Sequence, residues 1–228
     1  MRTAICISGQ PRCAKEGYEY LKTSILDRNE NCDIFVHAWI DHSKVGQRYH
    51  FGHPALVLPD TDKMVLDLYK PVKHEFELQQ PFDDHKYDPG PYGDSCPNYM
   101  IFTVQSMFYG WSRVNAMRKA YEEENKFQYD CVVRIRFDLA LSTPFIFSEY
   151  DLNSIWCKNC CMHEPGCMND HFAFSNRENM DVYLSIHNHL DEATKDCPFC
   201  PEVVLGRYFK LRNVPVTQIP IESYVIRG

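Results

Sequence analysis

A short apolar run that ends in charged side chains constrains the fold of this chain more than any other feature. Residues 129–141 read YDCVVRIRFDLAL, and this density of β-branched and aromatic side chains predicts a buried strand. Arg134, Arg136 and Asp138 interrupt the run near its carboxyl end. Charges buried without partners cost several kcal/mol, so these three side chains must meet counter-ions, a metal ion or a ligand.

The position of Asp138 makes it the first candidate for chemistry. In an open α/β sheet, ligands bind just beyond the carboxyl ends of the strands, and this run places Asp138 at such an end. The alternative is an internal ion pair between Arg136 and Asp138 that only fixes the end of the strand.

Length and charge limit the classes of protein to which the chain can belong. A length of 228 residues predicts a single α/β domain over 1–228 with a sizeable core. The formal net charge of −7 argues against a general nucleic-acid or anionic-membrane binder. No apolar run reaches the length of a membrane span, and residues 1–9 are too short for a signal peptide, so we expect a cytoplasmic protein without a transmembrane segment.

Strand and helix patterns alternate along the chain, which predicts an α/β fold. Apolar runs predict further strands at 3–8, 33–39, 72–78, 169–175 and 214–220. Helical spacing predicts one helix after Arg12, a second that is capped by Asp60 or Thr61 and stopped by Pro71, and a third from near Pro97 to about Asn125. A fourth helix is predicted to begin at a capping box of Ser175 and Glu178 and to extend to Leu190, and a fifth to begin at Pro201. Residues 79–97 are interpreted as a lid or acceptor-side loop, with disorder as the alternative, and 143–166 as irregular.

Four motifs, in this order, resemble a known family. They are residues 8–12 (SGQPR), 32–39 (CDIFVHAW), 129–139 (YDCVVRIRFDL) and 169–174 (NDHFAF). The chain is similar to the small GT-A-type glycosyltransferases of bacterial polysaccharide clusters and of large DNA viruses of algae. The resemblance implies a Rossmann-like mixed sheet, flanked by helices, that binds a nucleoside-diphosphate sugar such as a UDP- or GDP-sugar. It also implies transfer of the sugar to a glycan or glycoprotein acceptor.

The same resemblance implies roles for individual residues. GT-A enzymes hold a divalent metal against the diphosphate with an Asp-x-Asp turn at a strand end, where this chain has Arg136-Phe137-Asp138. Because the first aspartate is missing, Asp138 alone remains as the expected ligand of Mn²⁺ or Mg²⁺, which would neutralise the leaving diphosphate. The expected donor-binding residues are Ser8, Gly9, Gln10, Arg12, Gln105, Arg134, Arg136 and Asp138.

An inverting glycosyl transfer also needs a base for the acceptor hydroxyl. Asp170 lies at the start of a predicted strand, on the acceptor side by resemblance, and is the expected base, with Glu202 as the second candidate. A cap or turn role is the alternative for Asp170. His171 is the one histidine that its position singles out for testing.

Eleven cysteines, an odd number, form a second pattern. Cys157, Cys160, Cys197 and Cys200 make two CxxC pairs, whose spacing is typical of a structural zinc site in a Cys-rich segment at about 157–200. Substitute ligands are Cys161, His163 and Cys167. Free thiols or disulfides are the alternatives, and the later CxxC pair lies too far along the chain to favour a redox motif.

The sequence thus predicts a nucleotide-sugar-dependent glycosyltransferase assisted by a divalent metal. The rival interpretation is a zinc-stapled, non-catalytic module that binds a glycan or a protein. A thiol oxidoreductase built on Cys197 is a third interpretation.

Overall fold

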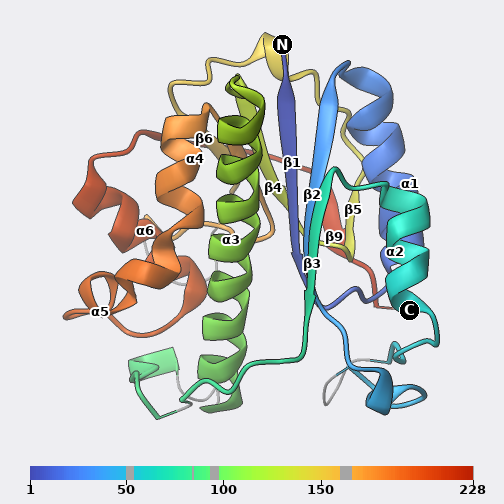
Figure 1. Cartoon of the computed structure of the whole chain (residues 1–228). Helices are drawn as coiled ribbons and strands as arrows, with labels where there is room; N and C mark the ends of the chain where they lie inside the picture. The colour runs from blue at the N-terminus through green and yellow to red at the C-terminus, as the bar shows by residue number, and fades with distance from the viewer. Residues whose placement is uncertain (50–53, 84, 93–97, 160–165, 228) are drawn as a thin grey trace.

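The fold is built on one seven-stranded sheet (Figure 1). The computed structural model describes residues 1–49, 54–83, 85–92, 98–159 and 166–227. In spatial order the strands are β3 (Lys73–Glu77), β2 (Cys32–Trp39), β1 (Thr3–Gly9), β4 (Cys131–Ile135), β7 (Phe172–Ser175), β6 (Ile155–Lys158) and β8 (Val216–Ile219). A separate two-stranded sheet pairs β5 (Leu139–Leu141) with β9 (Ser223–Val225).

The large sheet is mixed. Strands β3, β2, β1 and β4 run parallel, whereas β7 is antiparallel to both β4 and β6, and β8 is parallel to β6. The predicted fold class, an α/β protein with a mixed sheet flanked by helices, is therefore confirmed. The extent of the single domain over 1–228 stays a prediction.

Helices cover both faces of the sheet (Figure 1). On one face lie α1 (Ala14–Ser24) and α2 (Thr61–Tyr69), together with the β5–β9 pair. On the other face lie α3 (Asn98–Asn125), α4 (Arg177–Leu184), α5 (Leu190–Ala193) and α6 (Pro201–Arg212). Short 3-10 turns occur at Leu26–Arg28, His42–Lys44, Gly90–Tyr92, Phe147–Glu149 and Ile186–His189. Within the described residues, no helix is both long and apolar enough to cross a membrane.

Each face of the sheet buries its own core. Side chains alternate along β1, so that Ala4 and Cys6 belong to the core beneath α3 while Ile5 and Ile7 belong to the core beneath α1. The helix predicted from near Pro97 to about Asn125 is confirmed as α3, and its side chains buried in the core include Val104, Phe108, Trp111 and Val114. Burial of apolar surface in these two cores stabilises the packing of the helices on the sheet.

The strand predicted at 129–141 is wrong in its second half. Strand β4 ends at Ile135, Arg136 leaves the ladder, and Phe137 and Asp138 form a turn. The chain then continues as β5, which pairs with β9 rather than with β1. In a straight strand Arg136 and Asp138 would stand on the same face of the sheet, two residues apart. The turn brings their charged groups into direct contact as an ion pair.

Two other strand predictions also need correction. The region 143–166, expected to be irregular, contains β6, and β9 follows the strand expected to be the last. Both strands are short and pair with segments far away in the sequence. A local hydrophobic pattern therefore carries little information about them.

The cap predicted for α4 is also wrong. Asn176, not Ser175, caps this helix, and its side chain accepts a hydrogen bond from the Asn179 amide at 2.9 Å. Ser175 is buried, and its hydroxyl donates to the main-chain carbonyl of Leu152 at 2.8 Å. The helix ends at Leu184, so the rest of the predicted helix forms a 3-10 turn and α5.

Helix α2 starts where expected, but neither predicted cap forms. Asp60 takes the N-cap position with a φ of 56° and makes no side-chain cap bond. It pairs with Lys63 at 2.8 Å, while the Thr61 hydroxyl donates to the main-chain carbonyl of Leu58 at 2.7 Å.

Helix α1 packs very close to the turn after β4. A Cβ added at Gly17 would lie 1.7 Å from the carbonyl oxygen of Phe137, which is closer than any side chain can tolerate. Glycine at this position therefore lets α1 rest directly on the turn that contains Asp138. Because Arg12 lies just before α1, the same contact helps to set where Arg12 meets Asp138.

Replacing Gly17 by alanine tests this contact. Alanine is favoured over glycine inside a helix by about 1 kcal/mol. We nevertheless expect Gly17→Ala to lower the free energy of unfolding by about 1–3 kcal/mol, because the new methyl group overpacks against Phe137. Urea denaturation measures the change, and Glu19→Ala on the exposed side of α1 is the control, within about 0.5 kcal/mol of the wild type. A Gly17→Ala protein as stable as the wild type would contradict the contact.

Candidate functional site

The carboxyl ends of β1 and β4 lie side by side where the connections of the sheet change direction. From β1 the chain proceeds to β2 and β3 on one side, whereas β4 pairs with the other side of β1. In open α/β sheets, ligands bind in the crevice outside the carboxyl ends of the strands at such a switch point. The turns that leave β1 and β4, residues 8–12 and 136–138, therefore form the candidate site.

The turn after β1 has open space beside its glycine and carries a guanidinium. Gly9 has a φ of +122°, which L side chains rarely adopt, and a Cβ at this position would meet no atom within 4 Å. The side-chain amide of Gln10 donates to the main-chain carbonyl of Tyr49 at 3.4 Å. Cys13, with a φ of 47°, precedes α1. The Arg12 side chain, 13% exposed, turns toward the end of β4.

Asp138 is the centre of the charges at this edge. Arg136 donates to its two carboxylate oxygens at 2.8 and 3.0 Å, and Arg12 donates from Nη2 at 2.8 Å. Asp138 itself is 2% exposed. Burial alone would raise the pKa of Asp138, but Arg136 and Arg12 outweigh burial and lower the pKa to about 2. At neutral pH, Asp138 is therefore an anion held between two guanidiniums.

The metal ion expected at Asp138 does not fit these contacts. Both carboxylate oxygens already accept hydrogen bonds from guanidinium groups, so a divalent cation would meet positive charges instead of further oxygen ligands. In the described part of the chain, one group of three His, Cys, Asp or Glu side chains has its ligand atoms within 4.8 Å of one another, and it consists of His37, Glu75 and Glu77. The geometry at Asp138 is the internal ion pair given above as the alternative, extended by a second arginine.

Arg134 and Asp170 add a second charged group at the end of β4. Arg134 is 1% exposed, and its guanidinium carbon lies 4.4 Å from the centroid of the Trp111 ring. The Arg134 guanidinium donates a hydrogen bond to the main-chain carbonyl of Asp170. Burial lowers the pKa of Arg134 to about 10, so the guanidinium stays charged at neutral pH. The Asp170 carboxylate lies 3.4 Å from Nε2 of His171.

The Asp170 and His171 side chains both favour their deprotonated forms. Burial would raise the pKa of Asp170, but His171, Arg136 and Arg134 together lower it. Burial lowers the pKa of His171, against the opposing effect of Asp170. At neutral pH the pair is therefore an ionised carboxylate beside a neutral imidazole.

Three predicted site residues make other contacts. Ser8 lies on the face of β1 that α3 covers. Gln105 donates from its side-chain amide to the main-chain carbonyl of Asp83, in the loop after β3. Glu202 lies in the first turn of α6, where its carboxylate accepts a hydrogen bond from the Cys200 thiol at 3.3 Å. Roles for these three in catalysis or donor binding stay predictions.

The predicted zinc ligands are partly brought together. Cys167 and Cys200 are buried in one small cluster with Val203, and Cys197 packs against that cluster. Cys157 is buried in the core beneath α3. Outside the described residues lie Cys160, Cys161 and His163. Zinc binding therefore stays a prediction, with Cys167 in the position of a substitute ligand.

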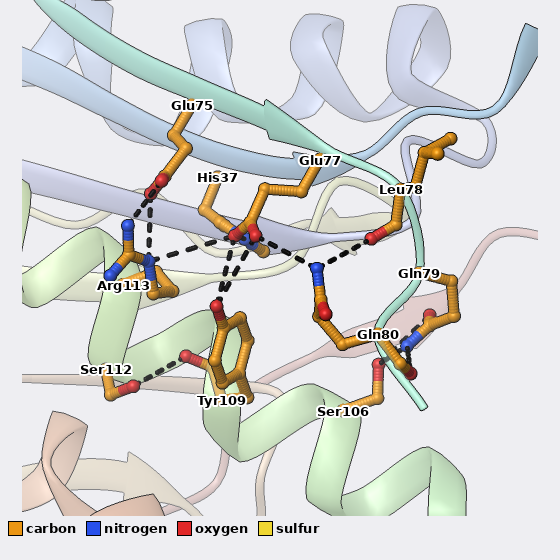
Figure 2. A network of polar contacts seen from close by, with 10 residues as sticks. All are labelled: His37, Glu75, Glu77, Leu78, Gln79, Gln80, Ser106, Tyr109, Ser112 and Arg113. Atoms are coloured by element: carbon orange, nitrogen blue, oxygen red, sulfur yellow. Dashed lines mark hydrogen bonds and ion pairs between the residues drawn. The ribbon is translucent and has the colours of Figure 1, made fainter. Parts of the chain in front are cut away.

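Figure 2 shows a polar network that the sequence reasoning missed. Because β1, β2 and β3 pair in register, Ser8, His37 and Glu75 form one row across the sheet, with Glu77 two residues farther along β3. Nε2 of His37 lies 2.8 Å from Oε1 of Glu77. Arg113 of α3 donates from Nε to Oε2 of Glu75 at 3.0 Å. The pair of glutamates two residues apart in a predicted strand, which places both on one face, is the signal that could have found it.

This network already contains its own cation. Arg113 offsets one of the two glutamate charges, which leaves a single negative charge beside His37. Burial lowers the pKa of His37, against the opposing effect of Glu77, so the imidazole is neutral at neutral pH. The three ligand atoms could hold a metal ion, but Nδ1 of His37 is buried without a hydrogen-bond partner among the described residues. A metal on Nε2 would force the ring proton onto this nitrogen, so the network fits a hydrogen-bonded neutral histidine better.

Acid titration of stability tests the neutral state of His37. The unfolded chain binds a proton at this histidine below its ordinary pKa of 6.5, whereas the folded protein resists protonation. The free energy of unfolding therefore falls as the pH drops below 6.5, by at most about 1.4 kcal/mol per pH unit for one such group. We expect His37→Gln to reduce this slope and His74→Gln, an exposed control, to leave it unchanged in urea unfolding at several pH values. Equal slopes for the wild type and His37→Gln would contradict a neutral His37.

Neither a protein-family model nor a curated protein sequence matches the chain. Among solved structures, the chain is similar to mouse xyloside xylosyltransferase 1, with a TM-score of 0.46, 10% identity, and coverage of 96% of this chain and 84% of that one. It is also similar to the glycosyltransferase GlyE of Streptococcus pneumoniae TIGR4, with a TM-score of 0.43, 12% identity, and coverage of 96% and 45%.

A third similar structure is a glycosyltransferase involved in the glycosylation of the major capsid of PBCV-1. Its TM-score is 0.43, its identity is 10%, and the match covers 96% of this chain and 82% of that one. All three TM-scores lie below 0.5.

Proposed function

We propose that this chain is a glycosyltransferase that moves a sugar from a nucleoside-diphosphate sugar, such as a UDP- or GDP-sugar, to a glycan or glycoprotein acceptor. The observation that carries the proposal is the meeting of the open turn after β1 with Arg12, Arg136 and Asp138 at the switch point of the sheet. The order of the four sequence motifs, which resembles that of GT-A-type glycosyltransferases, supports the same function.

Donor binding is assigned to the turn after β1 and to the two arginines. The free space around Gly9 allows a ligand to approach the backbone closely. Arg12 and Arg136 carry planar guanidinium groups, whose geometry matches pairs of phosphate oxygens. Asp138 positions both groups by accepting their hydrogen bonds. In this proposal Asp138 holds no metal ion, contrary to the expectation from sequence, because both of its carboxylate oxygens are paired with guanidiniums.

Acceptor activation is assigned to Asp170. Transfer with inversion requires a group that takes the proton of the attacking hydroxyl. Asp170 supplies an ionised carboxylate, and the neutral imidazole of His171 next to it can take the proton onward. Arg134 holds the main chain at this point through the Asp170 carbonyl.

A screen of UDP- and GDP-sugars tests the proposed function. A donor that binds the folded state alone raises the apparent stability, by about 2.7 kcal/mol at 100 times its Kd. We expect at least one nucleotide sugar to raise the melting temperature and to be slowly cleaved, which assays of released UDP or GDP detect. Stoichiometric zinc together with no stabilisation and no nucleotide release would favour the zinc-stapled binding module instead.

Asp170→Asn tests the proposed base. Loss of a general base lowers turnover by about 10²–10⁴-fold. We expect Asp170→Asn to reduce nucleotide release from the donor by this amount while keeping the donor-dependent rise in melting temperature. Asp67→Asn, exposed on α2, is the matched control and keeps wild-type turnover. If Glu202→Gln loses turnover and Asp170→Asn retains it, the base is Glu202.

A further inference from the structure

The segment after β9 lies against the turn that contains Asp138. Strand β9 pairs antiparallel with β5, with Val225 opposite Leu139. The Ile226 amide then donates to the main-chain carbonyl of Asp138 at 2.8 Å. Arg227 is the next residue, and it is exposed. The β5–β9 pairing, which no local sequence pattern predicts, therefore delivers a further arginine to the candidate site.

Two guanidiniums contact the Asp138 carboxylate, and a third lies nearby. Arg12 and Arg136 both bond to Asp138, and Arg227 is close enough to act electrostatically on Arg12. Burial lowers the pKa of Arg12, and the positive charges of Arg136 and Arg227 lower it as well. Asp138 has the opposite effect and raises the pKa of Arg12. Three positive charges and one negative charge leave two positive charges in excess, in a chain whose formal net charge is −7.

The charged groups nearby do not remove this excess. Arg134 and Asp170 also act on Arg136 or on Asp138, but their own charges are opposite and cancel. Like charges held together repel each other, so this arrangement favours a bound anion. The amino-terminal end of α1, which begins two residues after Arg12 and has no side-chain cap, adds a partial positive charge on the same side.

We propose that Arg12, Arg136 and Arg227 form an anion site for the diphosphate of the donor, in which arginines replace the metal ion expected at Asp138. The inference rests on the proposed function and deepens it. When the bond between the sugar and the phosphate oxygen breaks, its electron pair stays on the diphosphate, which gains one negative charge. Guanidiniums lose no proton at neutral pH, and they can stabilise the new negative charge by donating bidentate hydrogen bonds to the phosphate oxygens. Unlike Arg12 and Arg136, Arg227 makes no hydrogen bond to Asp138 among the contacts of the described residues. The Arg227 side chain is also exposed to solvent.

Isothermal titration with inorganic pyrophosphate tests the site on the full chain. We expect the wild type to bind pyrophosphate in a buffer that contains EDTA. Its affinity for pyrophosphate should not increase when Mn²⁺ replaces EDTA in the buffer. Arg227→Gln should weaken binding by roughly 10-fold, because it removes one charge-assisted contact. Arg207→Gln, which removes an exposed arginine from α6, is the control and should bind like the wild type. Since Arg227 is exposed, its replacement leaves the core intact.

Two results would overturn the inference. One is pyrophosphate binding that appears only when Mn²⁺ is present. The other is equal affinity of Arg227→Gln and Arg207→Gln. Nucleotide-sugar turnover that needs Mn²⁺ and is unaffected by Arg227→Gln would leave the proposed function standing and refute the arginine site. Metal-free pyrophosphate binding that Arg227→Gln weakens, without binding or cleavage of any UDP- or GDP-sugar, would refute the proposed function and leave the anion site standing.

Discussion

The buried carboxylate of Asp138 and its two arginine partners are the constraint on which the rest of the candidate site depends. A carboxylate that is 2% exposed must be compensated, and here the compensation comes from two different turns, through Arg12 after β1 and Arg136 after β4. The absence of a side chain at Gly17 lets α1 approach closely enough for this to happen. One ion cluster therefore ties together the two strand ends that define the switch point.

The parts of the fold that the sequence predicts are those encoded by long, local patterns. The apolar runs that become β1 and β2 are continuous, as strands buried on both faces must be, and the stripe along α3 extends over many turns. The charged end of β4 was recognisable because charges rarely follow such a run, so the placement of Asp138 beyond a strand end is confirmed.

The parts that the sequence could not predict depend on partners far along the chain. Strands β5 and β9 have three residues each, and only their mutual pairing brings Arg227 to Asp138. The row of His37 and Glu75 exists because two strands pair in one particular register, which no local pattern specifies. Ser175 resembles a helix cap in sequence, but burial directs its hydroxyl to a main-chain carbonyl instead.

At this edge of the sheet, arginines form ion pairs with both Asp138 and the two glutamates Glu75 and Glu77, which are the carboxylates that a metal ion would otherwise compensate. At Asp138 the partners are Arg12 and Arg136, and between Glu75 and Glu77 the partner is Arg113. A guanidinium is covalently part of the chain and stays protonated at neutral pH, so its charge does not vary with the supply of metal ions. In the proposed site, the strand-end motif Arg136-Phe137-Asp138 thus provides an arginine-held phosphate where a metal ion was expected, and Asp138 keeps its place beyond the strand end.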